Sequence, residues 1–219
     1  MNAPLKCFAA SADERIPTVE LLPISPAKRA LDVGLSAVGL VCSSPLWLLV
    51  AAAVKLEDGG PVLYRQRRVG LGGRVFDAIK FRSMIVDAER TTGVVWAKEN
   101  DPRVTRIGRV LRATATDELP QLWNILKGDM SFVGPRPERP EAIVRLIDQI
   151  PNYHERHRIQ PGLTGLAQVY RPYDAPDADK LIFDLEYIER RCFWLDLKLI
   201  ALSFWITFRG RWEARGKKV

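Results

Sequence analysis

The feature that most constrains this 219-residue chain is a long apolar run near its N-terminus. Residues 30–54 carry Asp32 as their only charge. A straight helix of that length measures roughly 37 Å at about 1.5 Å per residue. The hydrocarbon core of a bilayer is about 30 Å thick, so the run predicts a helix that enters a membrane.

The middle of this run is unsuited to an uninterrupted helix. Pro45 removes a backbone hydrogen bond and disfavours a helical Ser44, although serine hydroxyls can satisfy carbonyls that are freed at a bend. Short basic flanks favour the cytoplasm, and they lie on both sides: Lys28, Arg29, Lys55, Arg65, Arg67 and Arg68. We therefore expect a re-entrant helix–break–helix over residues 28–56, with Ser44 and Pro45 at the membrane break. A kinked helix that spans the bilayer fully is the alternative.

The whole chain divides into an N-terminal tail and one domain. Residues 1–27 carry four prolines and no sustained period, so we expect a mobile N-terminal tail and no signal peptide. A chain of this length normally forms one domain with a sizeable core, which we place at residues 28–219. Within it, residues 57–219 are expected to form the cytoplasmic region.

The charge balance indicates an anionic partner. The formal net charge is +7 and the pI is about 9.5, which suits nucleic acid, membrane lipid or a phosphorylated substrate. The three cysteines are too scattered for a disulfide framework or a zinc site, which favours a reducing compartment. His154 and His157 lack further residues that would complete a metal site, so we expect both on a helix surface.

Residues 62–70 and 74–82 predict a β-hairpin around a glycine-rich loop at residues 70–73. Its basic residues are opposed locally by Asp77 alone: Arg65, Arg67, Arg68, Arg74, Lys80 and Arg82. One interpretation is a solvated basic hairpin beside anionic lipid, where each charge contributes about 1 kcal/mol. The other assigns Lys80 and Arg82 to a site that binds a diphosphate.

Further helices are expected at residues 137–149, 179–191 and 194–208. The last one is rich in tryptophan and is followed by basic residues, a pattern that suits a helix lying in the membrane interface. Packing onto the domain core is the alternative. Together these elements predict an α+β fold that is predominantly helical, with a small β-hairpin and interfacial amphipathic helices, in a monotopic membrane protein.

Residues 115–137 are the centre of the chain. Leu119, Leu122, Trp123 and Leu126 recur at the spacing of one helix face, and Gly128 ends that helix. Pro120 fits only the first turn, so the helix should begin close to Asp117. Asp117 and Glu118 then lie at a helix N-terminus, where the dipole and free N–H groups keep a carboxylate ionised. The alternative is that Asp117 is only an N-cap, which contributes about 1 kcal/mol.

These carboxylates lie among cations. Arg103, Arg106, Arg109 and Arg112 recur every third residue before them, and Arg112 is best placed to reach the acids. Arginine suits phosphate oxygens, and magnesium commonly takes one or two carboxylates together with substrate phosphate. Asp117, Glu118, Arg112, Lys80 and Arg136 therefore form a candidate site for phosphoryl transfer beside a membrane segment.

Several motifs strengthen this interpretation. The stretches Asp117–Asn124, Lys127–Ser131 and Gly134–Pro137, in this order and spacing, resemble the catalytic core of the bacterial sugar transferases, the monotopic phosphoglycosyl transferases. Lys80–Met84 and residues 158–169 resemble further family motifs. The resemblance covers about residues 28–210. The chain departs from the family pattern at Gln160, where a basic residue is usual, and at Leu166, where tryptophan is usual.

The resemblance implies a reaction. A nucleoside-diphosphate sugar, expected to be a UDP-sugar, binds with Mg²⁺, for which Asp117 is a ligand. Asp117 attacks the sugar-bearing phosphate, and undecaprenyl or another polyprenyl phosphate then attacks the phosphosugar on the aspartate. Arg136 holds phosphate, and Glu118 positions metal or substrate. The resemblance also implies the re-entrant helix and a place at the cytoplasmic face of the bacterial inner membrane, where the enzyme would initiate exopolysaccharide, O-antigen or related glycan assembly.

The expected partners are the two substrates and membrane lipid, without nucleic acid, and a homodimer is left open. Two other functions compete with this one. A non-catalytic, membrane-anchored protein that binds nucleic acid or anionic lipid would explain the charge and the anchors. A soluble nucleotide-binding regulator would require residues 30–54 to be a buried core helix. Release of a nucleoside monophosphate from nucleoside-diphosphate sugars distinguishes the transferase from the binding protein, and solubility without detergent would favour the regulator.

Overall fold

The computed structural model describes residues 12–90, 101–172 and 174–208. The described chain is predominantly helical, as the sequence predicts, and it contains two small sheets. The α-helices are α1 (Pro26–Asp58), α2 (Arg106–Ala113), α3 (Gln121–Lys127), α4 (Pro140–Gln149), α5 (Leu166–Tyr170), α6 (Asp177–Arg190) and α7 (Phe193–Phe208). The strands are β1 (Leu63–Val69), β2 (Val75–Phe81), β3 (Ser131–Val133) and β4 (Gly162–Thr164). Short 3-10 helices are η1 (Ala12–Arg15), η2 (Leu71–Gly73), η3 (Thr116–Glu118) and η4 (Tyr153–Arg158).

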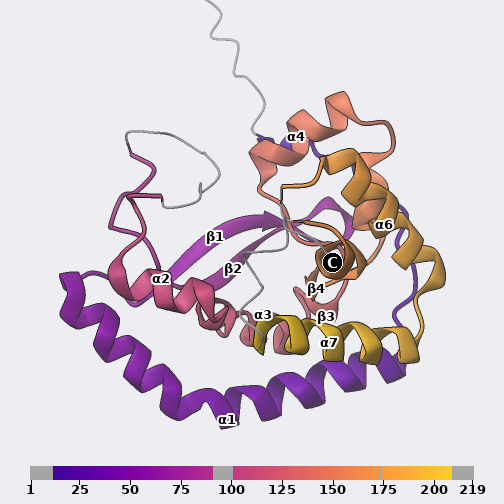
Figure 1. Ribbon diagram of the computed structural model, residues 1–219. Coiled ribbons are helices and arrows are strands. Elements are labelled where there is room, and N and C mark those ends of the chain that lie inside the picture. The colour runs from indigo at the N-terminus through magenta and orange to yellow at the C-terminus, as the bar shows by residue number, and fades with distance from the viewer. Residues whose placement is uncertain (1–11, 91–100, 173, 209–219) are drawn as a thin grey trace, which may run out of the picture.

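Helix α1 is continuous for 33 residues and has Pro45 inside it. Figure 1 shows that it bends near its middle, so that both of its ends turn toward the rest of the molecule. The Ser44 hydroxyl donates to the Val41 carbonyl oxygen at 2.8 Å, which is the acceptor that the missing N–H of Pro45 would have used. The expected compensation by serine is therefore confirmed, whereas the expected break is a bend in an unbroken helix.

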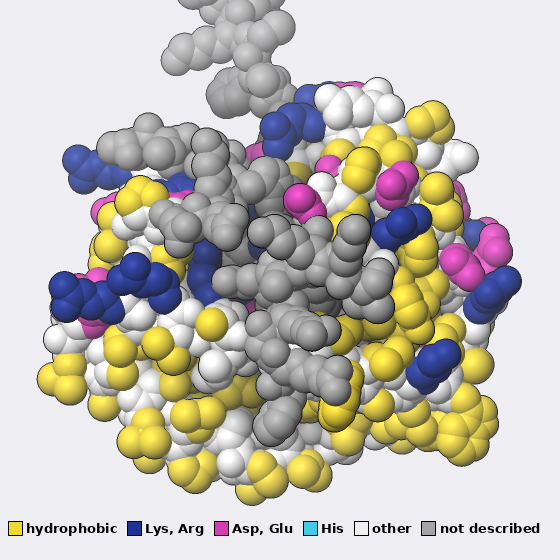
Figure 2. Space-filling model, in the orientation of Figure 1, with side chains coloured by type: hydrophobic (Ala, Val, Ile, Leu, Met, Phe, Trp, Pro, Cys, Tyr) yellow, Lys and Arg dark blue, Asp and Glu magenta, His cyan; other side chains and the backbone are white. Residues whose placement is uncertain are grey.

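Most of α1 is not covered by the rest of the described chain. Only 11% of its most apolar 18-residue stretch is buried, and by length and composition it is the one described helix able to cross a membrane. Its large exposed side chains include Val38, Val41, Leu46, Leu48 and Leu49. Figure 2 shows hydrophobic side chains along the lower edge of the molecule, over α1. This surface is compatible with membrane association.

Both ends of α1 hold other helices. Near its start, the Arg29 guanidinium donates to the carbonyl oxygens of Ile125 and Leu126 at 2.8 and 2.6 Å, at the end of α3. Near its other end, Glu57 Oε1 accepts from the backbone N–H of Arg106, the first residue of α2, at 2.6 Å. Each charge complements the dipole of the helix that it touches. Helix α1 thus fixes the two helices on either side of the predicted carboxylates.

The predicted hairpin is confirmed. Strands β1 and β2 are antiparallel, with Leu63 opposite Phe81 and Val69 opposite Val75. Gly72 and Gly73 form the turn at φ of 67° and 80°, a region that L-residues rarely adopt. The second sheet was not predicted: β3 and β4 form a parallel pair of three residues each, too short for a periodic sequence signal.

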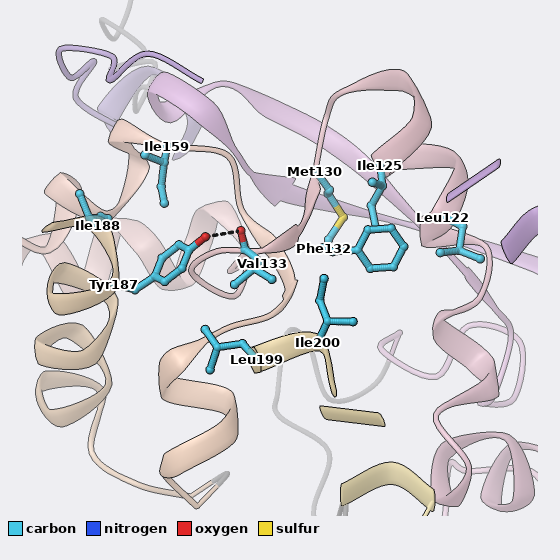
Figure 3. Packing of buried hydrophobic residues seen from close by; sticks show 10 residues of the cluster. All are labelled: Leu122, Ile125, Met130, Phe132, Val133, Ile159, Tyr187, Ile188, Leu199 and Ile200. Carbon is cyan, nitrogen blue, oxygen red and sulfur yellow. Dashed lines mark hydrogen bonds between the residues drawn. The ribbon is translucent and has the colours of Figure 1, made fainter. Parts of the chain in front are cut away.

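The main hydrophobic cluster joins α3, β3, α6 and α7 (Figure 3). Tyr187 of α6 lies inside it and donates from its hydroxyl to the Val133 carbonyl oxygen at 3.2 Å. Leu199 and Ile200 bring one face of α7 into the cluster, so the core-packing alternative is confirmed for that face. The opposite face exposes Trp194 by 75% and also exposes Phe204 and Trp205. Trp212 and the basic residues that follow α7 lie outside the described residues.

Three expectations were wrong in detail. Residues 1–27 were expected to form a mobile tail, but in its described part Ile16 is buried in a cluster with α4 and Leu22 donates its backbone N–H to the Arg158 carbonyl oxygen at 3.0 Å. His157 is buried instead of exposed, and burial together with Arg156 lowers its pKa to about 3. Trp123 was expected to share one helix face with Leu122, but Leu122 is buried, whereas Trp123 is exposed and lines an apolar groove together with residues of α1, the hairpin and Pro120.

Candidate active site

The adjacent carboxylates lie in a 3-10 turn that leads into α3. Ala115 precedes the turn at φ 53°, and both Leu119 and Pro120 have right-handed helical backbone angles before α3 starts at Gln121. The helical path therefore begins near Asp117 as predicted, but the α-helix itself starts four residues later. Neither η3 nor α3 has a side-chain cap, so the N-cap alternative does not account for Asp117.

Glu118 is held by two cations that come from different elements. Lys80 Nζ of β2 donates to Glu118 Oε1 at 2.8 Å, and Arg136 of the turn after β3 donates to the same oxygen at 3.0 Å. Burial alone would raise the pKa of Glu118, but Lys80 and Arg136 outweigh it and hold this pKa well below its usual range. Glu118 is thus a fixed anion that draws Lys80 and Arg136 together.

Asp117 has the opposite environment. Its side chain is only 8% exposed, yet among the described residues no hydrogen bond or ion pair reaches its carboxylate. Burial raises its pKa to about 6, and the Glu118 charge adds to this rise, whereas Lys80, Arg112 and Arg136 oppose it. The prediction that the helix terminus keeps Asp117 readily ionised therefore needs correction. With a pKa near 6, about nine tenths of the carboxyl is still ionised at pH 7.

Arg112 completes the positive side of the site. It comes from the last turn of α2 and donates from Nε to Ser83 Oγ at 2.9 Å, and its charge lowers the pKa of Asp117. Helix α2 approaches Ser83 closely because it has a glycine there: a Cβ on Gly108 would lie 2.0 Å from the Ser83 carbonyl oxygen. Gly108 thus permits the contact between α2 and Ser83 that places Arg112.

Arg82 is not brought to this group. Its guanidinium pairs with the Asp58 carboxylate at the end of α1 and also donates to the Pro61 carbonyl oxygen at 2.6 Å. Arg82 therefore closes the turn between α1 and β1. Of the four cations expected to bind phosphate, the structure gathers Lys80, Arg112 and Arg136 around the carboxylates.

Two arginines that the sequence analysis did not assign to the site hold the turn that carries Arg136. Arg156 donates to the Arg136 carbonyl oxygen at 2.9 Å, and Arg68 donates to the Pro137 carbonyl oxygen at 2.8 Å. Arg156 also forms a buried ion pair with Asp184 at 2.7 Å. Among 33 basic residues in the chain, no spacing distinguishes these two from surface arginines. The backbone of the turn is consequently fixed, which directs Arg136 toward Glu118.

The donor set suits a metal that is shared with a substrate. Within the described ranges, no group of three or more His, Cys, Asp or Glu residues could hold a metal ion. Magnesium is usually held by one or two carboxylates plus substrate phosphate and water. The buried Asp117 carboxylate, with no partner among the described residues, fits such a site.

Comparison with known proteins gives the class of the molecule. The chain belongs to the bacterial sugar transferase family, whose model matches residues 24–210. This confirms the resemblance that the motifs indicate.

Three curated relatives are similar to this chain over most of its length. The chain is 44% identical over 177 residues to the UDP-N-acetylgalactosamine-undecaprenyl-phosphate N-acetylgalactosaminephosphotransferase of Aeromonas hydrophila, covering 79% of this chain and 41% of that protein. It is 44% identical over 184 residues to the undecaprenyl-phosphate glucose phosphotransferase of Komagataeibacter xylinus, covering 80% and 35%. It is 42% identical over 200 residues to the UDP-glucose:undecaprenyl-phosphate glucose-1-phosphate transferase of Caulobacter vibrioides, covering 84% and 74%. The chain thus spans less than half of the first two relatives.

Proposed function

We propose that this protein transfers a sugar 1-phosphate from a UDP-sugar to undecaprenyl phosphate through a covalent phosphosugar on Asp117. The observation that carries the proposal is the contrast between two adjacent buried carboxylates. Glu118 is neutralised by Lys80 and Arg136, whereas Asp117 has no partner among the described residues. A carboxylate that is left unpaired beside cations is available as a nucleophile.

The reaction then has two displacements at one phosphorus atom. In the first, an Asp117 oxygen forms a bond to the sugar-bearing phosphorus, and the bond from that phosphorus to the UMP oxygen breaks. In the second, an oxygen of the acceptor phosphate forms a bond to the same phosphorus, and the bond to Asp117 breaks. Both nucleophiles are anions, so neither step requires removal of a proton. The products are UMP and undecaprenyl-diphospho-sugar, and Asp117 is regenerated.

The cations stabilise the charge on the transferred group. The Lys80 ammonium has three donors, and one of them engages Glu118, so Lys80 can bind a phosphate oxygen while Glu118 holds it in place. Arg136 and Arg112 add positive charge from two other directions, which suits the oxygens of a phosphoryl group. Magnesium bound through Asp117 would neutralise further charge on the diphosphate.

We place the site at the cytoplasmic face of the inner membrane, with α1 entering the bilayer and returning. The support is that Arg29 and Glu57, near opposite ends of α1, bind α3 and α2 of the same body, while the helix between them bends and exposes apolar side chains. A helix that crossed the bilayer would place these two ends on opposite sides. The names of the relatives specify different sugars. We propose that the transfer catalysed by this protein is the step that initiates a surface glycan.

Release of UMP from UDP-sugars in the presence of undecaprenyl phosphate tests the proposal. We expect Asp117→Asn to reduce turnover below about a hundredth of the parent rate, the scale of a lost nucleophile. Arg82→Lys is the matched control, since Arg82 is a basic residue of the same strand region that is directed to Asp58. An Asp117→Asn enzyme that keeps turning over would refute the assignment.

A further inference from the structure

Asn124 is a buried polar residue of α3 that the proposed reaction does not use. It is 1% exposed. Its side-chain Oδ1 accepts from the backbone N–H of Ile79 at 3.0 Å, and its Nδ2 donates to the carbonyl oxygen of Asp77 at 2.8 Å. Nδ2 also lies 3.1 Å from Asp129 Oδ2. The amide is therefore satisfied on both of its atoms.

These contacts make Asn124 a substitute for a third strand. The other edge of β2 pairs with β1, and within a strand the carbonyl of one residue and the N–H two residues later point to the same edge. Asp77 and Ile79 are such a pair, and the single amide of Asn124 satisfies both groups. The edge of β2 that faces α3 is thereby fixed at this point without a strand.

The residue after this point is Lys80, whose ammonium binds Glu118. The segment that begins with η3 and continues through α3 thus contacts β2 twice. Asn124 binds backbone groups of β2, and Glu118 binds the side chain of Lys80, the residue that follows Ile79. With the backbone of Ile79 fixed, Lys80 starts from a fixed position beside the carboxylates.

We propose that Asn124 is a positioning residue that places Lys80 against Glu118. The inference rests on the proposed function only for the role of Lys80 toward phosphate. A residue that merely joined the hairpin to α3 would affect stability, whereas a positioning residue must also change the interaction between Lys80 and Glu118.

The expected effect follows from the contact. Lys80 Nζ lies 2.8 Å from Glu118 Oε1, and residues that form such a pair are energetically coupled, so that removing both does not cost the sum of removing each alone. If the Asn124 amide holds Lys80 in place, its removal should abolish most of this coupling.

The test is a pair of double-mutant cycles on the full chain in detergent. The free energy of unfolding is measured at pH 7 for the parent, Lys80→Met, Glu118→Gln and the double variant, and the same four proteins are measured with Asn124→Ala added. The difference between the two cycles reports the change in the coupling between Lys80 and Glu118 and cancels any general loss of stability. Ile125→Ala is the control, because Ile125 is the next residue of α3 and packs into the main cluster. Asn124→Ser, which leaves room for water, replaces Asn124→Ala if the latter does not fold.

Loss of the coupling with Asn124→Ala and its persistence with Ile125→Ala would support the inference. An unchanged coupling with Asn124→Ala, or an equal loss with both substitutions, would overturn it. Failure of the proposed function is a separate result: the parent would release no UMP from UDP-sugars, while the unfolding cycles would still report the coupling between Lys80 and Glu118.

Discussion

Replacing the proposed nucleophile should make the protein more stable at neutral pH. Asp117 has a pKa of about 6 in the folded protein against an ordinary value of 3.8. In the unfolded chain the Asp117 carboxyl therefore loses its proton at a pH about two units lower than in the folded protein. The folded state binds more protons between these values, so this group lowers the stability as the pH rises through that window.

The size of the effect follows from the shift. One pKa unit corresponds to about 1.4 kcal/mol, so ionised Asp117 costs the folded state about 3 kcal/mol above pH 7. Asn has nearly the same shape and no charge, and Asp117→Asn should recover this energy. For a chain of this size the gain corresponds to a rise in Tm of about 6–12 °C at pH 8.

Glu118 supplies a matched control with the opposite sign. Its pKa lies below the ordinary 4.5, so its ionised form stabilises the fold above that pH, and this stabilisation is lost as the pH falls below it. Glu118→Gln should lower the stability at pH 8 by about 2 kcal/mol, the scale of hydrogen bonds to charged groups. Two neighbouring carboxylates should therefore respond to the same kind of substitution in opposite directions.

Thermal unfolding of purified protein in one detergent at pH 4, 6 and 8 measures these effects. The gain from Asp117→Asn should be largest at pH 8, smaller at pH 6 and close to zero at pH 4. A loss of stability at pH 8, or a gain that is equal at pH 4 and pH 8, would show that the Asp117 carboxyl is not destabilised by its site.

Three further predictions concern the cations, the metal and the membrane helix. Arg136→Lys keeps the charge but loses the planar guanidinium, so the rate of UMP release should fall about tenfold or more; an unchanged rate would remove Arg136 from the phosphate site. Excess chelator should abolish UMP release and Mg²⁺ should restore it, whereas full activity in chelator would reject a metal. With Cys42 and Cys192 replaced by alanine, an impermeant maleimide should label Cys7 only in lysed spheroplasts. Pro45→Ala restores the backbone donor and should expose Cys7 in intact ones; labelling of the parent before lysis would indicate a helix that crosses the bilayer.

The parts that were predictable share one property, which is that their signal is local. Periodicity and turn residues predicted the hairpin and most of the helices. The sequence motifs pointed to Glu118, Lys80 and Arg136, and the structure brings these three residues into contact. The compensating hydrogen bond of Ser44 also follows from the proline beside it.

The parts that were missed depend on distant neighbours. Arg82 and Lys80 are two residues apart on the same strand region, yet one pairs with Asp58 and the other with Glu118, because the end of α1 happens to lie beside Arg82. Asn124 gives no sequence signal of its role, since its partners are backbone groups of β2. The raised pKa of Asp117 arises from burial, which a helix terminus alone does not reveal.

Mass spectrometry of the intact parent protein, mixed with a UDP-sugar and Mg²⁺ but no acceptor, tests the covalent intermediate most directly. We predict a mass increase of one sugar phosphate per chain, located on the peptide that contains Asp117, with release of one equivalent of UMP. Addition of undecaprenyl phosphate should remove the adduct. UMP release that requires the acceptor from the start, with no adduct on the chain, or an adduct on another residue, would contradict it.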